Sequence, residues 1–238
     1  TKIDHIISQG KKPIFIFEAF MGCGGQLPLP RQFLKRGHKL IQRSCGISIA
    51  DEVQTGFGRL GNHFWAFDFF DIKPDIVTLG KSMGNGFPLS AVITTKEIAN
   101  RFDNGMEYFN SFGGNPVSSV VGNTVLQIIA DEGLQENAKD VGQYLKRQLL
   151  ELKLKNPIFE DVRGEGLFLG IEIVDLEKDK TPHPILANYI VNKMKDKYIL
   201  LSVDGPKKNI IKIKPPLLFN KENADFLVEN FYKVLLSL

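Results

Sequence analysis

The stretch that most directly indicates the fold is Ile47-Ser48-Ile49-Ala50-Asp51-Glu52. Its apolar half reads as a short strand, and its two acids mark the point where that strand ends. Two similar stretches flank it along the chain: residues 13–17 end at Glu18, and residues 75–79 end at Gly80-Lys81. Because helical or looped stretches separate these strands, the sequence predicts an α/β architecture with a largely parallel sheet.

Three ionisable side chains, Glu18, Asp51 and Lys81, therefore follow the carboxyl ends of predicted strands. In open parallel sheets, ligands bind outside this edge. A ligand site is one interpretation of the pattern. The other is three surface charges at the points where strands meet water, and periodicity alone does not separate the two.

The remaining elements follow from hydrophobic periodicity and capping residues. We expect a helix over 31–43, a fourth strand over 89–94, and a helix capped by Thr95. Later helices are predicted over 116–131, 134–151, 184–196 and 221–237, and strands over 159–163, 167–174, 198–202 and 210–214. The second half thus reads as a compact α+β domain. We place the boundary near residue 145, which gives domains 1–145 and 146–238.

Composition narrows the function classes. The formal net charge is only +3 and there is no basic block beyond short pairs, which argues against nucleic-acid binding. No apolar run reaches the length of a membrane span. Cys23 and Cys45 form no metal-ligand pattern, so we expect free thiols, no metal, and a cytoplasmic or other reducing compartment. A Cys23–Cys45 disulfide stays open as an alternative.

Five motifs follow one another along the chain: Asp51-Glu52-Val53-Gln54-Thr55-Gly56-Phe57-Gly58-Arg59, the lysine segment 74–86, Ser111-Phe112-Gly113-Gly114-Asn115-Pro116, Val162-Arg163-Gly164-Glu165-Gly166-Leu167, and Lys212-Ile213-Lys214-Pro215-Pro216-Leu217. They resemble the motifs of the class-III aminotransferases, a family of enzymes that use pyridoxal 5'-phosphate (PLP). The ordered set covers most of the chain. The resemblance implies a PLP-dependent transferase of fold type I, represented by the C-terminal portion of its large domain and a small α+β C-terminal domain.

The resemblance also implies roles for individual residues. Lys81 is expected to be the Schiff-base lysine that carries PLP and later moves the substrate proton. Asp51 is expected to face the ring nitrogen and keep it protonated. Gln54 is assigned to the ring-hydroxyl side of the cofactor, and Val53 to packing against the ring face. Glu52 is adjacent to Asp51 and is expected to point elsewhere.

Further roles concern the cofactor phosphate and the substrate. Ser111 stands where the family usually has Thr, and would bind the cofactor phosphate from a neighbouring subunit, which implies a homodimer with sites at the interface. Glu18 is a candidate carboxylate near the cofactor, with a purely structural role as the alternative. Lys212 stands where many members have an Arg that clamps a substrate carboxylate, and a lysine cannot reproduce that two-pronged contact.

Residues 193–216 resemble most closely the branch that contains alanine–glyoxylate aminotransferases and ethanolamine-phosphate phospho-lyases. We therefore expect an enzyme that acts on a small primary amine, with amine-phosphate phospho-lyase chemistry favoured and amino-acid/keto-acid transamination of the alanine–glyoxylate type as the alternative. A truncated, non-catalytic dimerisation module is the third hypothesis, and the intact Asp51 and Lys81 argue against it. The family's phosphate-binding cup has no counterpart here, so we expect the isolated chain to bind PLP weakly or not at all and to be inactive. The complete, full-length protein is expected to bind PLP covalently.

Overall fold

The computed structural model describes residues 2–238, which pack as two compact units. Unit 1 consists of residues 2–19, Leu29–Phe57 and Trp65–Glu132. Unit 2 consists of Phe20–Pro28, Gly58–Phe64 and Gly133–Leu238. The boundary predicted near residue 145 falls inside helix α5 (Leu134–Lys155), whose buried face packs in unit 2 from its first residue, Leu134.

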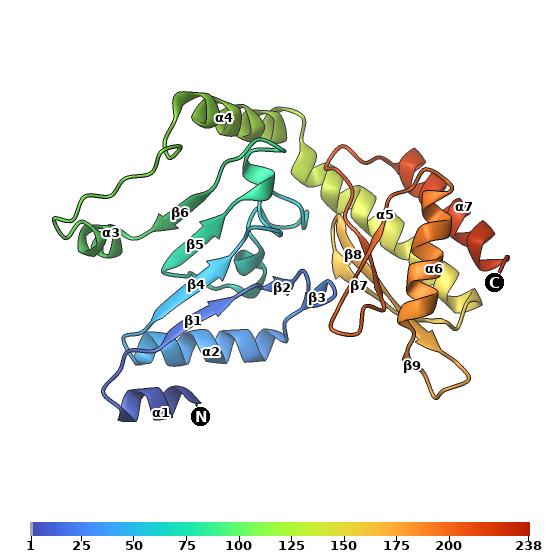
Figure 1. Cartoon of the computed structure of the whole chain (residues 1–238), viewed down its shortest axis with the longest axis horizontal. Coiled ribbons are helices and arrows are strands. Elements are labelled where there is room, and N and C mark those ends of the chain that lie inside the picture. Colours follow the sequence, from blue (N-terminus) through green and yellow to red (C-terminus); the bar gives the residue numbers. More distant parts are fainter. Residues whose placement is uncertain (1) are drawn as a thin grey trace. The chain divides into compact units, whose positions relative to one another are not determined.

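Unit 1 is built around a four-stranded sheet with the order β1-β4-β5-β6 (Figure 1). The strands are β1 (Ile14–Phe17), β4 (Ile47–Asp51), β5 (Ile76–Leu79) and β6 (Ala91–Thr94). The pairs β1–β4 and β4–β5 are parallel, and β6 joins β5 antiparallel. The unit also contains α1 (Lys2–Ser8), α2 (Arg31–Arg43), η1 (Ala66–Phe70), η2 (Lys81–Met83), α3 (Lys96–Phe102) and α4 (Pro116–Asp131).

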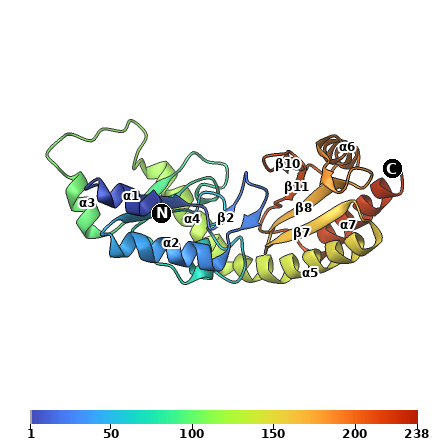
Figure 2. The same ribbon diagram turned by 90° about the horizontal axis from the view of Figure 1, so that it is seen from below.

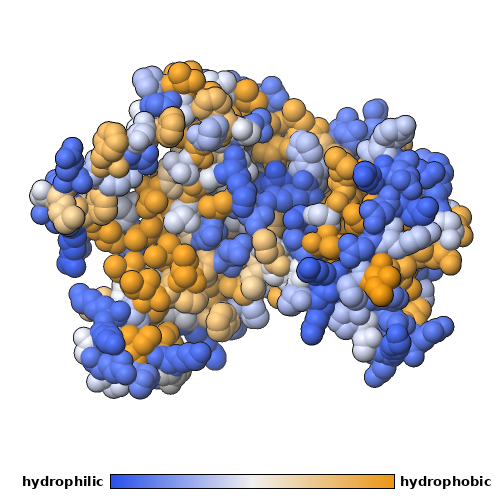
Figure 3. Space-filling model, viewed as in Figure 1, coloured by the Kyte–Doolittle hydropathy of each residue, from blue (hydrophilic) through white to orange (hydrophobic). Residues whose placement is uncertain are grey.

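The two faces of this sheet differ. Helix α2 packs on β1 and β4, and a Cβ on Gly37 of α2 would lie 3.3 Å from the ring of Phe15. The alternate side chains of β1, Ile14 and Ile16, are 65% and 62% exposed. Figure 3 shows hydrophobic residues gathered where the strands of this unit lie. One face of the sheet is therefore covered by α2, whereas the other presents apolar side chains that the described residues leave exposed.

Unit 2 has an α+β fold. Its antiparallel sheet has the order β10-β11-β8-β7, formed by β7 (Phe159–Glu165), β8 (Phe168–Asp175), β10 (Ser202–Asp204) and β11 (Ile210–Ile213), with β9 (Thr181–Pro182) paired to β8. Helices α5, α6 (Pro184–Lys195) and α7 (Lys221–Leu235) pack with this sheet around a core that includes Leu145, Leu149, Ile171 and Phe231 (Figure 2). A two-stranded hairpin, β2 (Phe20–Met21) and β3 (Leu27–Pro28), belongs to the same unit.

Most predicted elements are confirmed, α2 and α4 with the predicted bounds. Thr95 caps α3 and Asn115 caps α4, with Pro116 at the first helical position. The strand predicted over 198–202 is wrong, because β10 begins only at Ser202. The chain there completes the end of α6 instead: Ile199 N–H donates to Met194 O, and Tyr198 adopts a left-handed φ of 62° and is 96% exposed.

Candidate active site

Asp51, Lys81 and Glu18 leave the sheet of unit 1 at the same edge. Asp51 is the last residue of β4 and is in register with Thr78 of β5, and the Glu52 N–H donates to Thr78 O at 3.0 Å. Strand β5 ends one residue later, at Leu79, and Lys81 opens η2. Phe17 of β1 is in register with Ala50, so Glu18 follows β1 as Asp51 follows Ala50. The predicted shared edge is thus present in the structure.

The Asp51 carboxylate has a fixed orientation. It is half-buried, and its Oδ1 accepts a hydrogen bond from the Val53 N–H at 3.0 Å. This short loop, in which an aspartate binds the backbone two residues on, holds the side chain in place. One bond uses only part of the accepting capacity of a carboxylate. Asp51 can therefore receive a further donor, such as a protonated ring nitrogen.

Lys81 lies in a strained and tightly packed turn. Its backbone has a φ of 42°, in the left-handed region that a lysine rarely adopts, and its side chain is exposed. Met83 N–H donates to Gly80 O, and Gly84 N–H donates to Lys81 O. A Cβ on Gly84 would lie 2.0 Å from Phe87 O, so only glycine fits there. The turn that carries Lys81 is therefore closely packed at Gly84.

Val53 and Gln54 lie in the loop after Asp51, and both are half-buried. A Cβ built on Gly80 would lie 3.6 Å and 3.7 Å from the two γ-methyl groups of Val53, so Val53 lies beside the residue that precedes Lys81. An apolar side chain between the aspartate loop and the lysine turn fits contact with one face of a planar ring. Contacts of Gln54 and Val53 with a cofactor remain predictions.

Glu52 is a feature that sequence reasoning missed. It is 1% exposed; its Oε2 accepts from Thr55 Oγ1 at 2.8 Å and its Oε1 from the Phe67 N–H at 2.9 Å. Burial raises its pKa to about 7, against the partly offsetting hydrogen bonds from Ala66, Thr55 and Phe67. Glu52 thus closes the 52–67 loop. Three signals could have revealed it: its place after a strand, the Thr three residues later, and the aromatic run that follows.

The predicted phosphate ligand Ser111 is exposed in the loop between α3 and α4. Its neighbour Asn110 orders this loop, because Asn110 Oδ1 accepts from the N–H groups of Phe112 and Gly113. A pocket of about 640 Å³ lies between this loop and the ends of β5 and β6, and its lining includes Leu79, Ser90 and Asn110. The loop therefore borders a cavity at the strand that leads to Lys81. A phosphate contact by Ser111 stays a prediction.

The predicted substrate residue Lys212 belongs to unit 2. It lies on β11, and its Nζ forms an ion pair with Asp204 Oδ2 at 2.9 Å. In the same unit the half-buried Arg59 donates to Leu167 O at 3.1 Å and to Pro215 O at 2.7 Å, so the arginine of the first motif packs against the two later motifs. Burial lowers the pKa of Arg59 to about 10.

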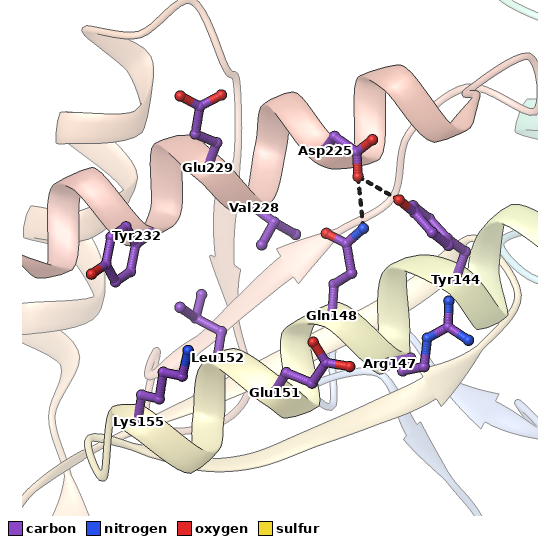
Figure 4. Close-up of a pocket in the computed structure, with 10 residues that line it drawn as sticks. All are labelled: Tyr144, Arg147, Gln148, Glu151, Leu152, Lys155, Asp225, Val228, Glu229 and Tyr232. Carbon is purple, nitrogen blue, oxygen red and sulfur yellow. Dashed lines mark hydrogen bonds between the residues drawn. The ribbon is translucent and has the colours of Figure 1, made fainter.

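Unit 2 has a further pocket of about 590 Å³, between α5 and α7 (Figure 4). Asp225 of α7 accepts hydrogen bonds there from Tyr144 Oη at 2.7 Å and from Gln148 Nε2 at 2.6 Å, both on α5. These bonds raise the pKa of Tyr144 and lower that of Asp225. No residue predicted for the cofactor or substrate lines this pocket, and its polar contacts tie two helices together.

Residues 2–238 show neither a metal site nor a membrane-spanning helix. No group of three or more His, Cys, Asp or Glu side chains in this range is arranged to hold a metal ion. Among its helices, none combines the length and the apolar character needed to cross a membrane. Cys23 and Cys45 are exposed thiols, so the disulfide between them that the sequence left open is not formed.

The side chains at the edge of unit 1 fit the ring end of PLP. Lys81 supplies an amine, Asp51 supplies a carboxylate with remaining acceptor capacity, and Val53 supplies an apolar contact between them. The sequence profile of the family Aminotransferase class-III matches residues 3–235. The chain belongs to this family of PLP-dependent enzymes.

The relatives include both types of enzyme that the resembled branch contains. The chain is 46% identical over 223 residues to the alanine–glyoxylate aminotransferase 2-like protein of Drosophila melanogaster, covering 93% of this chain and 45% of the relative. It is 43% identical over 212 residues to the ethanolamine-phosphate phospho-lyase homolog 1 of Caenorhabditis elegans, covering 88% of this chain and 45% of the relative. The chain thus spans about half the length of these relatives.

A solved structure of a phospholyase from Arthrobacter in complex with phosphoethanolamine superposes with a TM-score of 0.94 at 36% identity. The match covers 99% of this chain and 56% of that one. The predicted fold, which is the C-terminal portion of a PLP-dependent transferase with its small α+β domain, is therefore confirmed.

Proposed function

We propose that the protein acts on a small primary amine, with PLP attached to Lys81 and its ring nitrogen facing Asp51. One observation carries this proposal: Asp51 is the last residue of β4, Lys81 follows the adjacent parallel strand β5, and the two strands are in register at Asp51 and Thr78. The two side chains therefore leave the sheet at one edge, where α/β proteins bind their ligands.

When bound, PLP withdraws electrons from the carbon next to the substrate amine. The Asp51 carboxylate supports this by holding a proton on the ring nitrogen through a charge-assisted hydrogen bond. The Lys81 amine, once released from the cofactor, takes the proton from the substrate α-carbon as a general base. Val53, whose methyl groups lie beside Gly80, would shield one face of the bound ring from water. Glu18 follows the neighbouring strand, and we assign it to the surroundings of the same site.

For the substrate we favour an amine phosphate of the phosphoethanolamine type. Two observations support this: the C-terminal resemblance to the phospho-lyase branch, and the likeness to the Arthrobacter phospholyase. In this reaction the bond between Cβ and oxygen breaks, phosphate leaves with the bonding electrons, and water then releases an aldehyde and ammonia. Lys212 is a compact ammonium group, which suits a phosphate better than it suits two-pronged binding of a carboxylate.

Phosphate release distinguishes this reaction from transamination of the alanine–glyoxylate type. The likeness to the Drosophila relative is an argument for that alternative. The complete protein, loaded with PLP, is incubated with phosphoethanolamine and no keto acid. We expect equal amounts of inorganic phosphate, ammonia and aldehyde. If no phosphate appears, and alanine with glyoxylate yields pyruvate and glycine, the protein is a transaminase instead.

Assembly and location complete the proposal. We propose a homodimer in which Ser111 contacts the cofactor phosphate of the partner's site, in a reducing compartment such as the cytoplasm, where the exposed thiols of Cys23 and Cys45 stay reduced. Gel filtration tests the dimer: an active monomer would contradict the role of Ser111. The non-catalytic alternative predicts no turnover of either substrate pair by the wild-type protein.

A further inference from the structure

Lys212 is held in a chain of three polar side chains from three separate segments of unit 2. Its Nζ lies 2.9 Å from Asp204 Oδ2, and the same oxygen accepts a hydrogen bond from Gln26 Nε2, also at 2.9 Å. Asp204 ends β10, Lys212 lies on β11, and Gln26 lies in the turn of the β2–β3 hairpin. The side chains of Lys212 and Asp204 are 24% and 14% exposed.

Gln26 adopts an energetically unfavourable local state in this position. It is fully buried, its φ of 52° is in the left-handed region, and its Oε1 is buried without a hydrogen-bond partner among the described residues. Its Nε2 donates to both Gly22 O and Asp204 Oδ2. Rotating the amide would place Oε1 against these two acceptors, so the amide has only one favourable orientation.

The backbone around Gln26 is packed too closely to shift. A Cβ on Gly170 would lie 3.1 Å from Gln26 Oε1 and 3.0 Å from an Ile210 methyl group. A Cβ on Gly25 or on Gly205 would lie within 3.0 Å of the Ile210 side chain. Gly205 N–H also donates to Cys23 O at 3.0 Å, which ties the hairpin turn to the end of β10. The Asp204 carboxylate is therefore held rigidly.

A lysine side chain has four rotatable bonds and no planar fork, so it needs a partner to fix its charge in space. We propose that Asp204, oriented by Gln26, is a positioning residue that holds the Lys212 ammonium ready for the anionic group of the substrate. One of the three N–H donors of Lys212 is used on Asp204, and two remain for that anion. This proposal rests on the proposed function, because it takes Lys212 to be the cation that meets the substrate.

The test is a double-mutant cycle in the complete, PLP-loaded protein. D204N should raise the KM for phosphoethanolamine about ten-fold, the loss of roughly one well-placed charge-assisted contact, and leave kcat within about two-fold. In the K212A background, D204N should have no further effect on KM. D204E, which retains the carboxylate, should recover part of the affinity. The same ten-fold change is expected in equilibrium binding of inorganic phosphate by titration calorimetry.

D175N is the matched control, because Asp175 also lies in unit 2, is 16% exposed, and pairs with a lysine, Lys178, at 3.3 Å. It should change neither KM nor phosphate binding, and it reports whether an Asp-to-Asn change in this unit lowers the melting temperature. A lower KM in D204N would show that Asp204 competes with the substrate for Lys212, and would overturn the proposal. An equal effect of D204N with and without Lys212 would overturn it as well.

The positioning role of Asp204 and the choice of substrate can be tested separately. If the wild-type protein transaminates alanine and releases no phosphate from phosphoethanolamine, the phospho-lyase function fails. The same cycle is then measured on the KM for alanine, whose carboxylate is the anion. Loss of the D204N effect in the K212A background supports the positioning role, and a persistent effect contradicts it.

Discussion

The Glu52 carboxylate accepts a hydrogen bond from the Phe67 N–H at 2.9 Å, and so joins the residue after Asp51 to the start of η1. Glu52 faces the interior while Asp51 ends the strand with its side chain bound to the Val53 N–H. The aspartate proposed to face the cofactor is therefore followed by a buried carboxyl group that fixes the loop behind it.

This buried carboxyl group predicts an unusual pH dependence. Its pKa in the folded protein is raised to about 7 from an ordinary value of 4.5, so between these pH values the folded state binds the proton more tightly than the unfolded state. Its contribution to stability is fully present below pH 4.5 and is lost as the pH rises through 7; the full amount is at most about 3 kcal/mol. E52Q mimics the protonated group. Urea unfolding at pH 5 and pH 8 should show E52Q gaining stability relative to wild type at the higher pH, and a pH-independent difference would contradict the assignment.

The close approach of two glycines that are far apart in the sequence leads to a second prediction, on stability. A Cβ on Gly142 of α5 would lie 2.3 Å from the carbonyl carbon and oxygen of Gly166, the last glycine of the Val162–Leu167 motif. G142A should therefore lower the free energy of unfolding by about 2 kcal/mol or more, although alanine favours helices by about 1 kcal/mol. Q143A, at the next and exposed position of α5, is the control and should be neutral or slightly stabilising. Neutral behaviour of G142A would show that the helix can move away.

The hydrogen bonds of the half-buried Arg59 give a third prediction. R59A removes hydrogen bonds to Leu167 O and Pro215 O and leaves both carbonyl groups without this donor, so we expect a loss of about 2–4 kcal/mol in unfolding free energy. R101A, which removes an exposed arginine that pairs with Glu97 four residues away, should change stability by less than about 0.5 kcal/mol. Chemical unfolding of the two variants makes the comparison. Equal small effects would show that Arg59 is not needed for packing of unit 2.

The carboxylate of Asp51 gives a fourth prediction, on the catalytic rate. D51N keeps the size of the side chain and removes its charge, so kcat should fall by about 10²–10³-fold, the usual effect of removing one electrostatic contact to the reacting group. D71N is the control: Asp71 is exposed and pairs with Arg31 and Lys35 outside the proposed site. Steady-state rates of the complete protein test this. A D51N rate near that of D71N would remove Asp51 from the mechanism.

Local sequence signals predicted much of this structure. Capping by Thr95 and the bounds of α2 and α4 depend on neighbouring residues, and they were predicted correctly. The positions of Asp51 and Lys81 followed from the rule that parallel strands share an edge. The strand expected over 198–202 was wrong because residues at its start form the turn after α6. Backbone hydrogen bonds to Met194 and Lys195 stabilise this turn.

What sequence reasoning could not predict depends on contacts between distant residues. The Gln26–Asp204 hydrogen bond joins positions 178 residues apart, and no local pattern marks either residue as its partner. The burial of Glu52 depends on the position of η1, which sequence periodicity did not predict. The division into two units is a further example. Segments 20–28 and 58–64 pack in unit 2 although they precede most of unit 1 along the chain, so a single boundary near residue 145 does not describe the division.

The attachment of PLP to Lys81 is the central claim, and borohydride reduction of the complete protein tests it most directly. Reduction fixes the cofactor to the amine that carries it, and peptide mass spectrometry then locates the modified lysine. We predict a single labelled peptide containing Lys81, and neither labelling nor turnover in K81A. Label on another lysine, or none on the wild-type protein, would contradict the account.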